Sequence, residues 1–168
     1  MPETTEHVFL KLINDNRAII HKVSKMYMDD DEDRRDLFQE IVMQLWKAYP
    51  TFKGNSKFTT WMYRVALNTA LLFLKKETRK VDKTPLSENI DIADVAYSHD
   101  KEEKLDYLYK AVQELNSIEK ALIFLFLENQ SHKEIAQNLG ITEVNARVKL
   151  NRTKEKLQFI IKKNGYEF

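Results

Sequence analysis

Basic and amide side chains near the C-terminal end of the chain have the spacing of a nucleic-acid contact. Between residues 131 and 163 the sequence holds eight Lys and Arg residues against three acidic residues. Cations of this kind pair with phosphates, and side chains that reach base edges carry sequence specificity. The candidate contacts lie opposite an apolar stripe on one predicted helix: Arg147, Lys149, Asn151, Arg152 and Lys154. The pattern predicts a helix that enters the major groove of duplex DNA.

Two short helices around a tight turn are needed to position that face. Ser131 and Glu134 have the spacing of a capping box, which would start the first helix. Gly140 suits a turn with positive φ, and Thr142 is a typical N-cap for the second helix. The buried side of the second helix would be a stripe of Ala146, Leu150, Thr153 and Leu157. This is a helix-turn-helix pattern; the alternative is a helical hairpin whose basic face is merely solvated.

A second group of residues combines bases with aromatic rings. Over residues 53–80, seven Lys and Arg residues stand against Glu77 alone. Aromatic residues are interleaved with these bases: Phe52, Phe58, Trp61, Tyr63 and Phe73. Because rings stack on unpaired bases while cations meet phosphates, this mixture favours single-stranded nucleic acid. The alternative is that Phe58 and Trp61 are simply core residues.

Apolar periodicity predicts helices through most of the chain. The expected helices cover residues 7–27, 34–49, 58–78, 105–116 and 118–128, with the helix-turn-helix after them, and Ser117 is expected to cap the last of the five. The acidic run Asp29–Asp33 is either a loop or the start of the next helix, where acidic residues are favourable. Three glycines and three prolines leave little material for β-turns. The predicted fold is therefore all-α.

Residues 81–103 separate two predicted helical domains. This stretch has seven acidic residues against two lysines, contains Pro85 and shows no sustained helical period. We interpret it as an extended acidic linker. The predicted organisation is a small helical domain over residues 1–80, the linker over 81–103 and a second small helical domain over 104–168.

Composition excludes several classes of protein. The net charge is +1, 43% of residues are hydrophobic and 32% are charged, which is typical of a soluble protein with a core. The chain has no cysteine, and its four histidines are far apart, so neither disulfides nor a metal site is expected. No nucleotide-binding glycine motif, cofactor site or catalytic residue is evident, and we expect no enzyme. Neither a signal peptide nor an apolar run of about 20 residues is present, which predicts a cytoplasmic protein without membrane insertion.

Two stretches of the first predicted domain resemble a known family. They are Asp36-Leu37-Phe38-Gln39-Glu40 followed by Leu45-Trp46, and the run from Phe52-Lys53-Gly54 through Trp61-Met62-Tyr63-Arg64 to Asn68. Both resemble region 2 of bacterial RNA polymerase sigma factors, in the form found in the small extracytoplasmic-function (ECF) group of the sigma-70 family. The C-terminal helix-turn-helix is similar to region 4 of the same family. The two regions stand in the family's order and together cover nearly the whole chain.

The resemblance implies a role for each group of residues. Docking on the clamp helices of the polymerase β′ subunit is implied for Asp36, Gln39 and Glu40. Contacts with the −10 element, where a base is flipped out of the stack, are implied for Asn55, Ser56 and Lys57, with Trp61, Tyr63, Arg64 and Asn68 at the duplex edge and backbone. Reading of the −35 element is implied for Arg147, Val148, Lys149, Asn151 and Arg152, with Lys154 on a phosphate. Region 4 would also dock on the β flap.

The function implied is that of a subunit which directs core RNA polymerase to specific promoters and helps to open the −10 region. Promoter DNA and an anti-sigma protein are the other expected partners, and the acidic linker would pass through the polymerase channel in place of RNA. The main alternative is a stand-alone helix-turn-helix regulator of transcription. A protein-interaction module with an incidental basic face is a further alternative, which would lack salt-dependent affinity for DNA.

Overall fold

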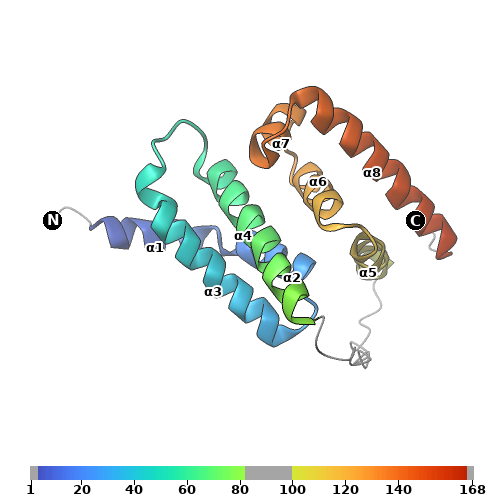
Figure 1. Ribbon diagram of the computed structural model, residues 1–168, viewed down its shortest axis with the longest axis horizontal. Coiled ribbons are helices and arrows are strands. Elements are labelled where there is room, and N and C mark those ends of the chain that lie inside the picture. Colours follow the sequence, from blue (N-terminus) through green and yellow to red (C-terminus); the bar gives the residue numbers. More distant parts are fainter. Residues whose placement is uncertain (1–3, 82–99, 166–168) are drawn as a thin grey trace. The chain divides into compact units, whose positions relative to one another are not determined.

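The computed structural model describes residues 4–81 and 100–165, with side chains over 4–76 and 104–165, and in these ranges it contains helices but no strand. The helices are α1 (Thr5–Asp15), α2 (Arg17–Tyr27), α3 (Asp31–Ala48), α4 (Phe58–Val81), α5 (Asp100–Gln113), α6 (Ser117–Leu127), α7 (His132–Leu139) and α8 (Glu143–Lys163), with the 3-10 turn η1 (Tyr49–Thr51) after α3 (Figure 1). The chain divides into two compact units, the first built mainly on α1 to α4 and the second mainly on α5 to α8. The predicted all-α fold with two helical parts is confirmed.

The first unit has a core drawn from all four of its long helices. Its buried apolar residues include Phe9, Ile13, Ile20, Val23, Leu37, Ile41, Leu45, Met62, Ala66 and Leu67. On α3 the buried positions Leu37, Ile41 and Leu45 recur every four residues, so one face of α3 is buried and the other remains for contacts. The α2 helix packs against α3, and burial raises the pKa of the Tyr27 phenol at the end of α2.

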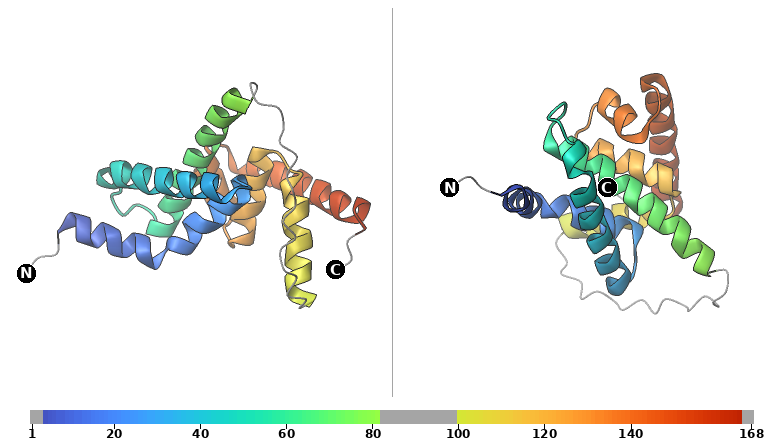
Figure 2. Two further views of the ribbon diagram at one scale, coloured as in Figure 1. Left: turned by 90° about the horizontal axis from the view of Figure 1, so that it is seen from below. Right: turned by 60° about the vertical axis from the view of Figure 1, so that its left-hand side comes forward.

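The single helix predicted over residues 7–27 is wrong, because the chain breaks at Asn16. There α1 ends and α2 begins, and Figure 2 shows the change of direction between them. The Asn16 amide donates to the carbonyl of Leu12 at 2.8 Å, while its backbone carbonyl accepts from Ile19. Asparagine competes with helical hydrogen bonding through such local bonds, which explains the break within a continuous apolar pattern.

The acidic run Asp29–Asp33 is the start of α3, one of the two possibilities left open by the sequence. The carboxylate of Asp30 caps the helix by accepting from the backbone N–H of Asp33 at 3.4 Å. The first turn of α3 then contains three acidic residues, which interact favourably with the positive end of the helix dipole. The helix therefore starts three residues before the predicted position.

The second unit is organised around α6, as its nearly continuous apolar sequence indicates. Residues 121–125 are all buried, and α6 packs against α8, which also contacts α5. The predicted cap at Ser117 is wrong by one residue, because Asn116 caps α6. Asn116 and Glu119 form a reciprocal capping box, with hydrogen bonds of 2.9 and 3.2 Å. The signal was in the sequence, since this pair has the same spacing as Ser131 and Glu134.

Helices extend into both ends of the segment predicted to be a linker. The α4 helix continues to Val81, and α5 begins at Asp100, within the acidic run that showed no sustained helical period. Acidic residues are favoured in the first turn of a helix, which accounts for the earlier start of α5. The predicted linker otherwise lies outside the described residues. No helix in the described ranges is both long enough and apolar enough to span a membrane.

Candidate nucleic-acid interface

The helix-turn-helix formed by α7 and α8 is built by three local devices. The Ser131 hydroxyl accepts from the Glu134 backbone N–H at 3.1 Å, and the Glu134 carboxylate accepts from the Ser131 backbone N–H at 2.9 Å. Gly140 then has a φ of +68°, a conformation that only glycine adopts at little cost. The Thr142 hydroxyl accepts from the Asn145 backbone N–H at 3.1 Å and starts α8. All three were predicted from the sequence, and they fix the direction in which α8 leaves the turn.

One side of α8 is buried along its whole length. Its buried residues are Ala146, Leu150, Thr153, Leu157 and Ile160, the first four of which form the stripe predicted from the sequence. The buried Thr153 hydroxyl donates to the backbone carbonyl of Lys149 at 2.7 Å, which satisfies it within the helix. The orientation of α8 about its own axis is therefore fixed by packing, and so is the identity of its exposed side.

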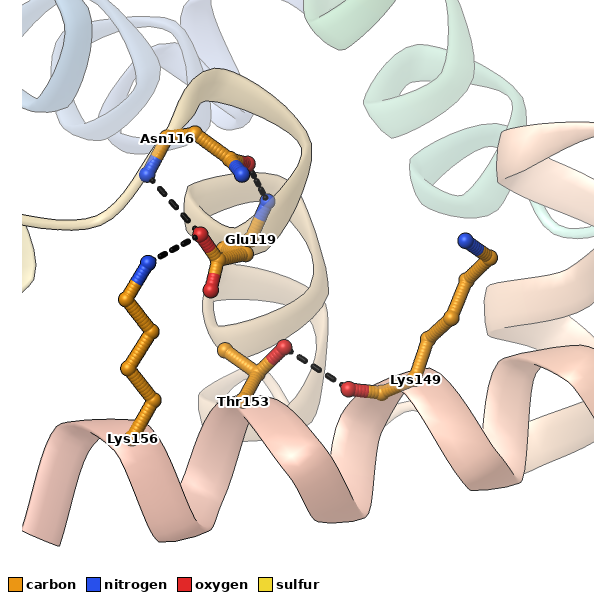
Figure 3. A network of polar contacts seen from close by, with 5 residues as sticks. All are labelled: Asn116, Glu119, Lys149, Thr153 and Lys156. Carbon is orange, nitrogen blue, oxygen red and sulfur yellow. Dashed lines mark hydrogen bonds and ion pairs between the residues drawn. The ribbon is translucent and has the colours of Figure 1, made fainter.

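A carboxylate on α6 links that helix to α8. Glu119 accepts both from the Asn116 backbone N–H that it helps to cap and from the Lys156 ammonium at 2.9 Å (Figure 3). Lys156, one of the eight basic residues between residues 131 and 163, therefore makes a structural contact with α6. Lys154 is also engaged, because its ammonium lies 3.8 Å from the centre of the Phe126 ring. Both contacts lie in the middle of α8 and support its position on α6.

The exposed side of the first half of α8 holds most of the predicted −35 contacts. Arg147, Val148, Lys149, Asn151 and Arg152 are all exposed, whereas Lys154 is partly buried. Arg147 lies 3.8 Å from Glu143 at the start of the helix, with both side chains more than half exposed. A surface pair of this kind contributes at most about 1 kcal/mol and is easily exchanged for a phosphate or a base. This surface is therefore exposed, with cationic and amide side chains around the apolar Val148.

The loop between η1 and α4 forms a second exposed polar surface, in the first unit. Gly54 has a φ of +75° and allows the tight bend of the loop. Asn55, Ser56 and Lys57 follow it and are all exposed. Apart from a 3.3 Å contact between the Ser56 hydroxyl and the adjacent carbonyl of Lys57, the side chains of these three residues form no hydrogen bond within the described residues. Their donors and acceptors face solvent.

A cluster of aromatic rings supports this loop. Phe52, Phe58 and Trp61 are mutually in contact, with ring centres 5.3 to 5.7 Å apart. The cluster continues from Trp61 through Tyr49 to Phe9 and Trp46, which joins the loop to α1 and α3. Phe52, Phe58 and Trp61 are each only partly buried. These rings are therefore both core residues and surface residues, so that neither reading of the sequence excludes the other.

The predicted contacts on α4 divide between two faces. Trp61, Arg64 and Asn68 are spaced by three and four residues and share one side of the helix, on which Arg64 and Asn68 are exposed. Tyr63 is only 6% exposed and lies among the buried residues of α4 with Met62 and Ala66. Its ring packs in the core of the first unit.

The predicted docking residues lie on the solvent side of α3. Asp36 and Gln39 are exposed, and the partly buried Glu40 carboxylate accepts from the Gln44 amide at 3.0 Å. A cavity of about 580 Å³ between α2 and α3 borders this group and includes Gln39 in its wall, together with Arg17, His21, Ser24, Lys25, Asp31, Arg34, Arg35 and Phe38. This basic recess was not predicted, because its residues come from two helices.

Comparisons with known proteins agree with this arrangement of surfaces. Residues 12–80 match the family Sigma-70 region 2, and residues 105–157 match the family Sigma-70, region 4. The chain belongs to the sigma-70 family. The two matches contain the loop with its aromatic cluster and the helix-turn-helix, respectively, and they stand in the order expected from the resemblance in the sequence.

Curated relatives place the chain in the ECF group of that family. It is 44% identical to the ECF RNA polymerase sigma factor SigG of Mycobacterium tuberculosis over 48 residues, which are 29% of this chain and 13% of SigG. It is 24% identical to the ECF RNA polymerase sigma-E factor of Escherichia coli over 135 residues, which are 73% of this chain and 71% of that relative. The chain therefore spans only about an eighth of SigG but most of sigma-E.

Solved structures show the same fold. The sigma factor RpoE of Bartonella quintana, in complex with the anti-sigma factor NepR, superimposes with a TM-score of 0.74 at 20% identity and covers 92% of this chain and 96% of its own. CnrH in complex with the cytosolic domain of CnrY superimposes with a TM-score of 0.66 at 15% identity, over 94% and 90% of the two chains. At these identities the likeness concerns the sigma-70 fold alone.

Proposed function

We propose that this chain is a dissociable specificity subunit of bacterial RNA polymerase. It binds core polymerase, recognises two promoter elements and helps to separate the strands at the −10 element. It is not an enzyme in this account, because nucleotide polymerisation belongs to the core. A protein with this role works beside the chromosome, in the cytoplasm. In this account residues 1–80 dock on core polymerase and open the −10 element. Residues 81–103 connect the two domains, and residues 104–168 bind the −35 element.

One observation carries this proposal: a single chain contains both an exposed polar loop on aromatic rings and a helix-turn-helix with an exposed cationic face. The loop suits an unpaired strand, because extruding a base costs a few kcal/mol and stacking on rings returns about 1–3 kcal/mol per base. The helix suits duplex DNA, because only the major groove admits an α-helix. A regulator that binds duplex DNA alone has no use for the first surface.

Docking on core polymerase is assigned to the exposed side of α3. Asp36, Gln39 and Glu40 form its polar part, and the bordering basic recess offers complementary charge to a partner with acidic residues. The exposed Met43 and Trp46 further along α3 add an apolar contact area. The clamp helices of β′ are the proposed partner for this surface, and the β flap is the proposed partner for the second unit.

An anti-sigma protein is the proposed regulator. Two solved structures with the same fold are complexes, one with the anti-sigma factor NepR and the other with the cytosolic domain of CnrY. Several large apolar residues of the second unit are exposed, including Leu105, Ile118, Leu127 and Phe159. Surfaces of this kind on a small protein are commonly covered by partners.

Run-off transcription tests the proposal. Purified core polymerase is incubated with a pooled promoter library, with and without this protein, and the 5′ ends of the transcripts are mapped. New start sites that share two spaced upstream elements, and that appear only when the protein is added, are the expected result. Salt-sensitive binding to duplex DNA without new transcripts would identify a stand-alone regulator instead. Absence of both activities would leave a protein-interaction module.

A further inference from the structure

Two valines stand at the centre of the exposed side of α8. Val144 is 69% exposed and Val148 is 42% exposed. They are four residues apart, so they lie on the same side of the helix about 6 Å apart along its axis. Val148 belongs to the predicted set of −35 contacts, whereas Val144 does not. Neither valine belongs to the buried core of the described residues.

Their position is set by the buried stripe on the other side of α8. A helix turns about 100° per residue, so the direction opposite the buried residues Ala146 and Leu150 is occupied by Val144 and Val148. Arg147 and Arg152 fall on the two flanks of this pair, and Asn151 follows it on the next turn. The outward face is thus an apolar centre between two cationic edges.

Exposed β-branched residues are unfavourable choices at these positions. Valine is a weaker helix former than alanine, lysine or glutamate, because its side chain is restricted against the preceding turn. Single exposed apolar residues are ordinary on protein surfaces. A pair at matching positions, in the half of a helix-turn-helix recognition helix whose residues contact base edges, indicates an apolar partner in the groove.

Thymine is the base that offers such a partner, because its C5-methyl group projects into the major groove. We propose that Val144 and Val148 read two thymine methyl groups in the duplex element bound by α8. The separation of the valines, about 6 Å, corresponds to about two base-pair steps of 3.4 Å. Asn151 supplies the polar contact beside them, and amide side chains pair in a bidentate manner with adenine. The inference rests on the proposed function of the second unit and specifies which bases it recognises.

Deoxyuridine provides a direct test, because it differs from thymidine only by the missing methyl group. Full-length protein with core polymerase selects binding sites from a randomised duplex pool, and each thymine of a selected site is then replaced singly by deoxyuridine. We expect selected sites to share two thymines about two steps apart. Replacement of either one should lower affinity about three- to fivefold, the effect of one buried methyl group. Replacement of thymines elsewhere in the duplex should change nothing.

Variants connect the methyl groups to the valines. In a Val144→Ala, Val148→Ala protein the deoxyuridine replacements should have no further effect, since their partners are already removed. Alanine is a better helix former than valine, so the variant retains α8. Leu10→Ala is the matched control: Leu10 is likewise an exposed apolar residue, 47% exposed, but it lies on α1 in the first unit. This control should keep the full sensitivity to deoxyuridine.

The outcomes separate this inference from the proposed function. Selected sites that bind tightly but carry no recurring thymine pair would overturn the inference and leave the proposed function intact. Sensitivity to deoxyuridine that persists in the double variant would also overturn it, because the methyl groups would then contact other residues. Failure to select any duplex site would contradict the proposed function itself, and the inference would fall with it.

Discussion

The two units of this sigma-70 family chain present the groups proposed to bind DNA in opposite ways. In the second unit the groups stand on a helix whose rotation is fixed by a buried stripe, so the contact surface is formed before DNA arrives. In the first unit Asn55, Ser56 and Lys57 stand on an exposed loop, and only the aromatic rings beneath them are packed. Duplex DNA has a regular groove that a rigid helix can match, whereas an unpaired strand must be gathered and stacked. The difference predicts that a substitution in one surface weakens binding by that surface and leaves binding by the other unchanged.

The largest effect is expected on the helix. Arg147→Ala with Arg152→Ala removes both cationic edges of the exposed face of α8. Because each bidentate Arg–guanine pair contributes about 1–3 kcal/mol, affinity for duplex sites should fall about 100-fold or more. Binding of core polymerase and of a single-stranded −10 oligonucleotide should be unchanged. Fluorescence anisotropy with duplex and single-stranded probes measures both.

A charge-matched control belongs to that experiment. Lys162→Ala with Lys163→Ala removes the same charge from the last turn of α8, far from its first half. This control should lose only the general, salt-dependent part of the affinity. An equal loss in both double variants would mean that α8 binds DNA by charge alone and has no specific face.

For the loop we expect a smaller loss of affinity, for single-stranded DNA and not for duplex DNA. Asn55→Ala with Lys57→Ala should weaken binding of the single-stranded non-template −10 oligonucleotide about tenfold, because a polar contact and a phosphate contact are lost. Duplex binding by the second unit should not change. Lys11→Ala, an exposed lysine on α1, is the control. A loss on duplex and single strand alike would remove the distinction between the two surfaces.

Core docking should separate from both DNA surfaces. Asp36→Ala with Gln39→Ala should lower affinity for core polymerase about tenfold, since hydrogen bonds to charged groups contribute about 1.5–3 kcal/mol each and solvent replaces part of this. Duplex and single-strand affinities of the free protein should remain. Biolayer interferometry with immobilised core polymerase measures the affinity for core polymerase. Unchanged affinity for core polymerase would mean that the docking surface does not lie on α3.

A substitution in the turn between α7 and α8 should lower stability alone. Gly140→Ala places a side chain at a φ of +68°, although a Cβ there meets no atom within 4 Å. The cost is therefore backbone strain of about 1–2 kcal/mol. Hydrogen exchange should show lower protection of α7 and α8, because the strain lies in the turn that joins these two helices. Unchanged protection would mean that the turn tolerates other conformations.

The smallest effect concerns the link between α6 and α8. Lys156→Met removes the ion pair with Glu119 but keeps the aliphatic stem. Since the Lys156 side chain is 48% exposed, the loss of stability should stay below about 1 kcal/mol. Glu119→Gln should cost more, because Glu119 also completes the capping box of α6. Denaturant unfolding compares the two variants, and a larger cost for Lys156→Met would contradict this ranking.

Local chemistry explains what the sequence could predict. The capping box at Ser131, the turn at Gly140 and the stripe on α8 depend on residues close together in the chain, and all were predicted correctly. The break at Asn16 was missed because an apolar period continued across it. The burial of Tyr63 was not predicted, because burial is decided by packing between helices, which spacing alone did not reveal. The basic recess between α2 and α3 was missed for the same reason.

Photocrosslinking in the open promoter complex tests the central claim most directly. Benzoylphenylalanine is introduced at position 55 or at position 151, and the crosslinked nucleotides are mapped on both strands. The account predicts that position 55 crosslinks the non-template strand within the melted segment, while position 151 crosslinks duplex DNA upstream of it. Crosslinks from both positions to the same duplex stretch, or from position 55 to duplex alone, would contradict the division of labour between the loop and the helix.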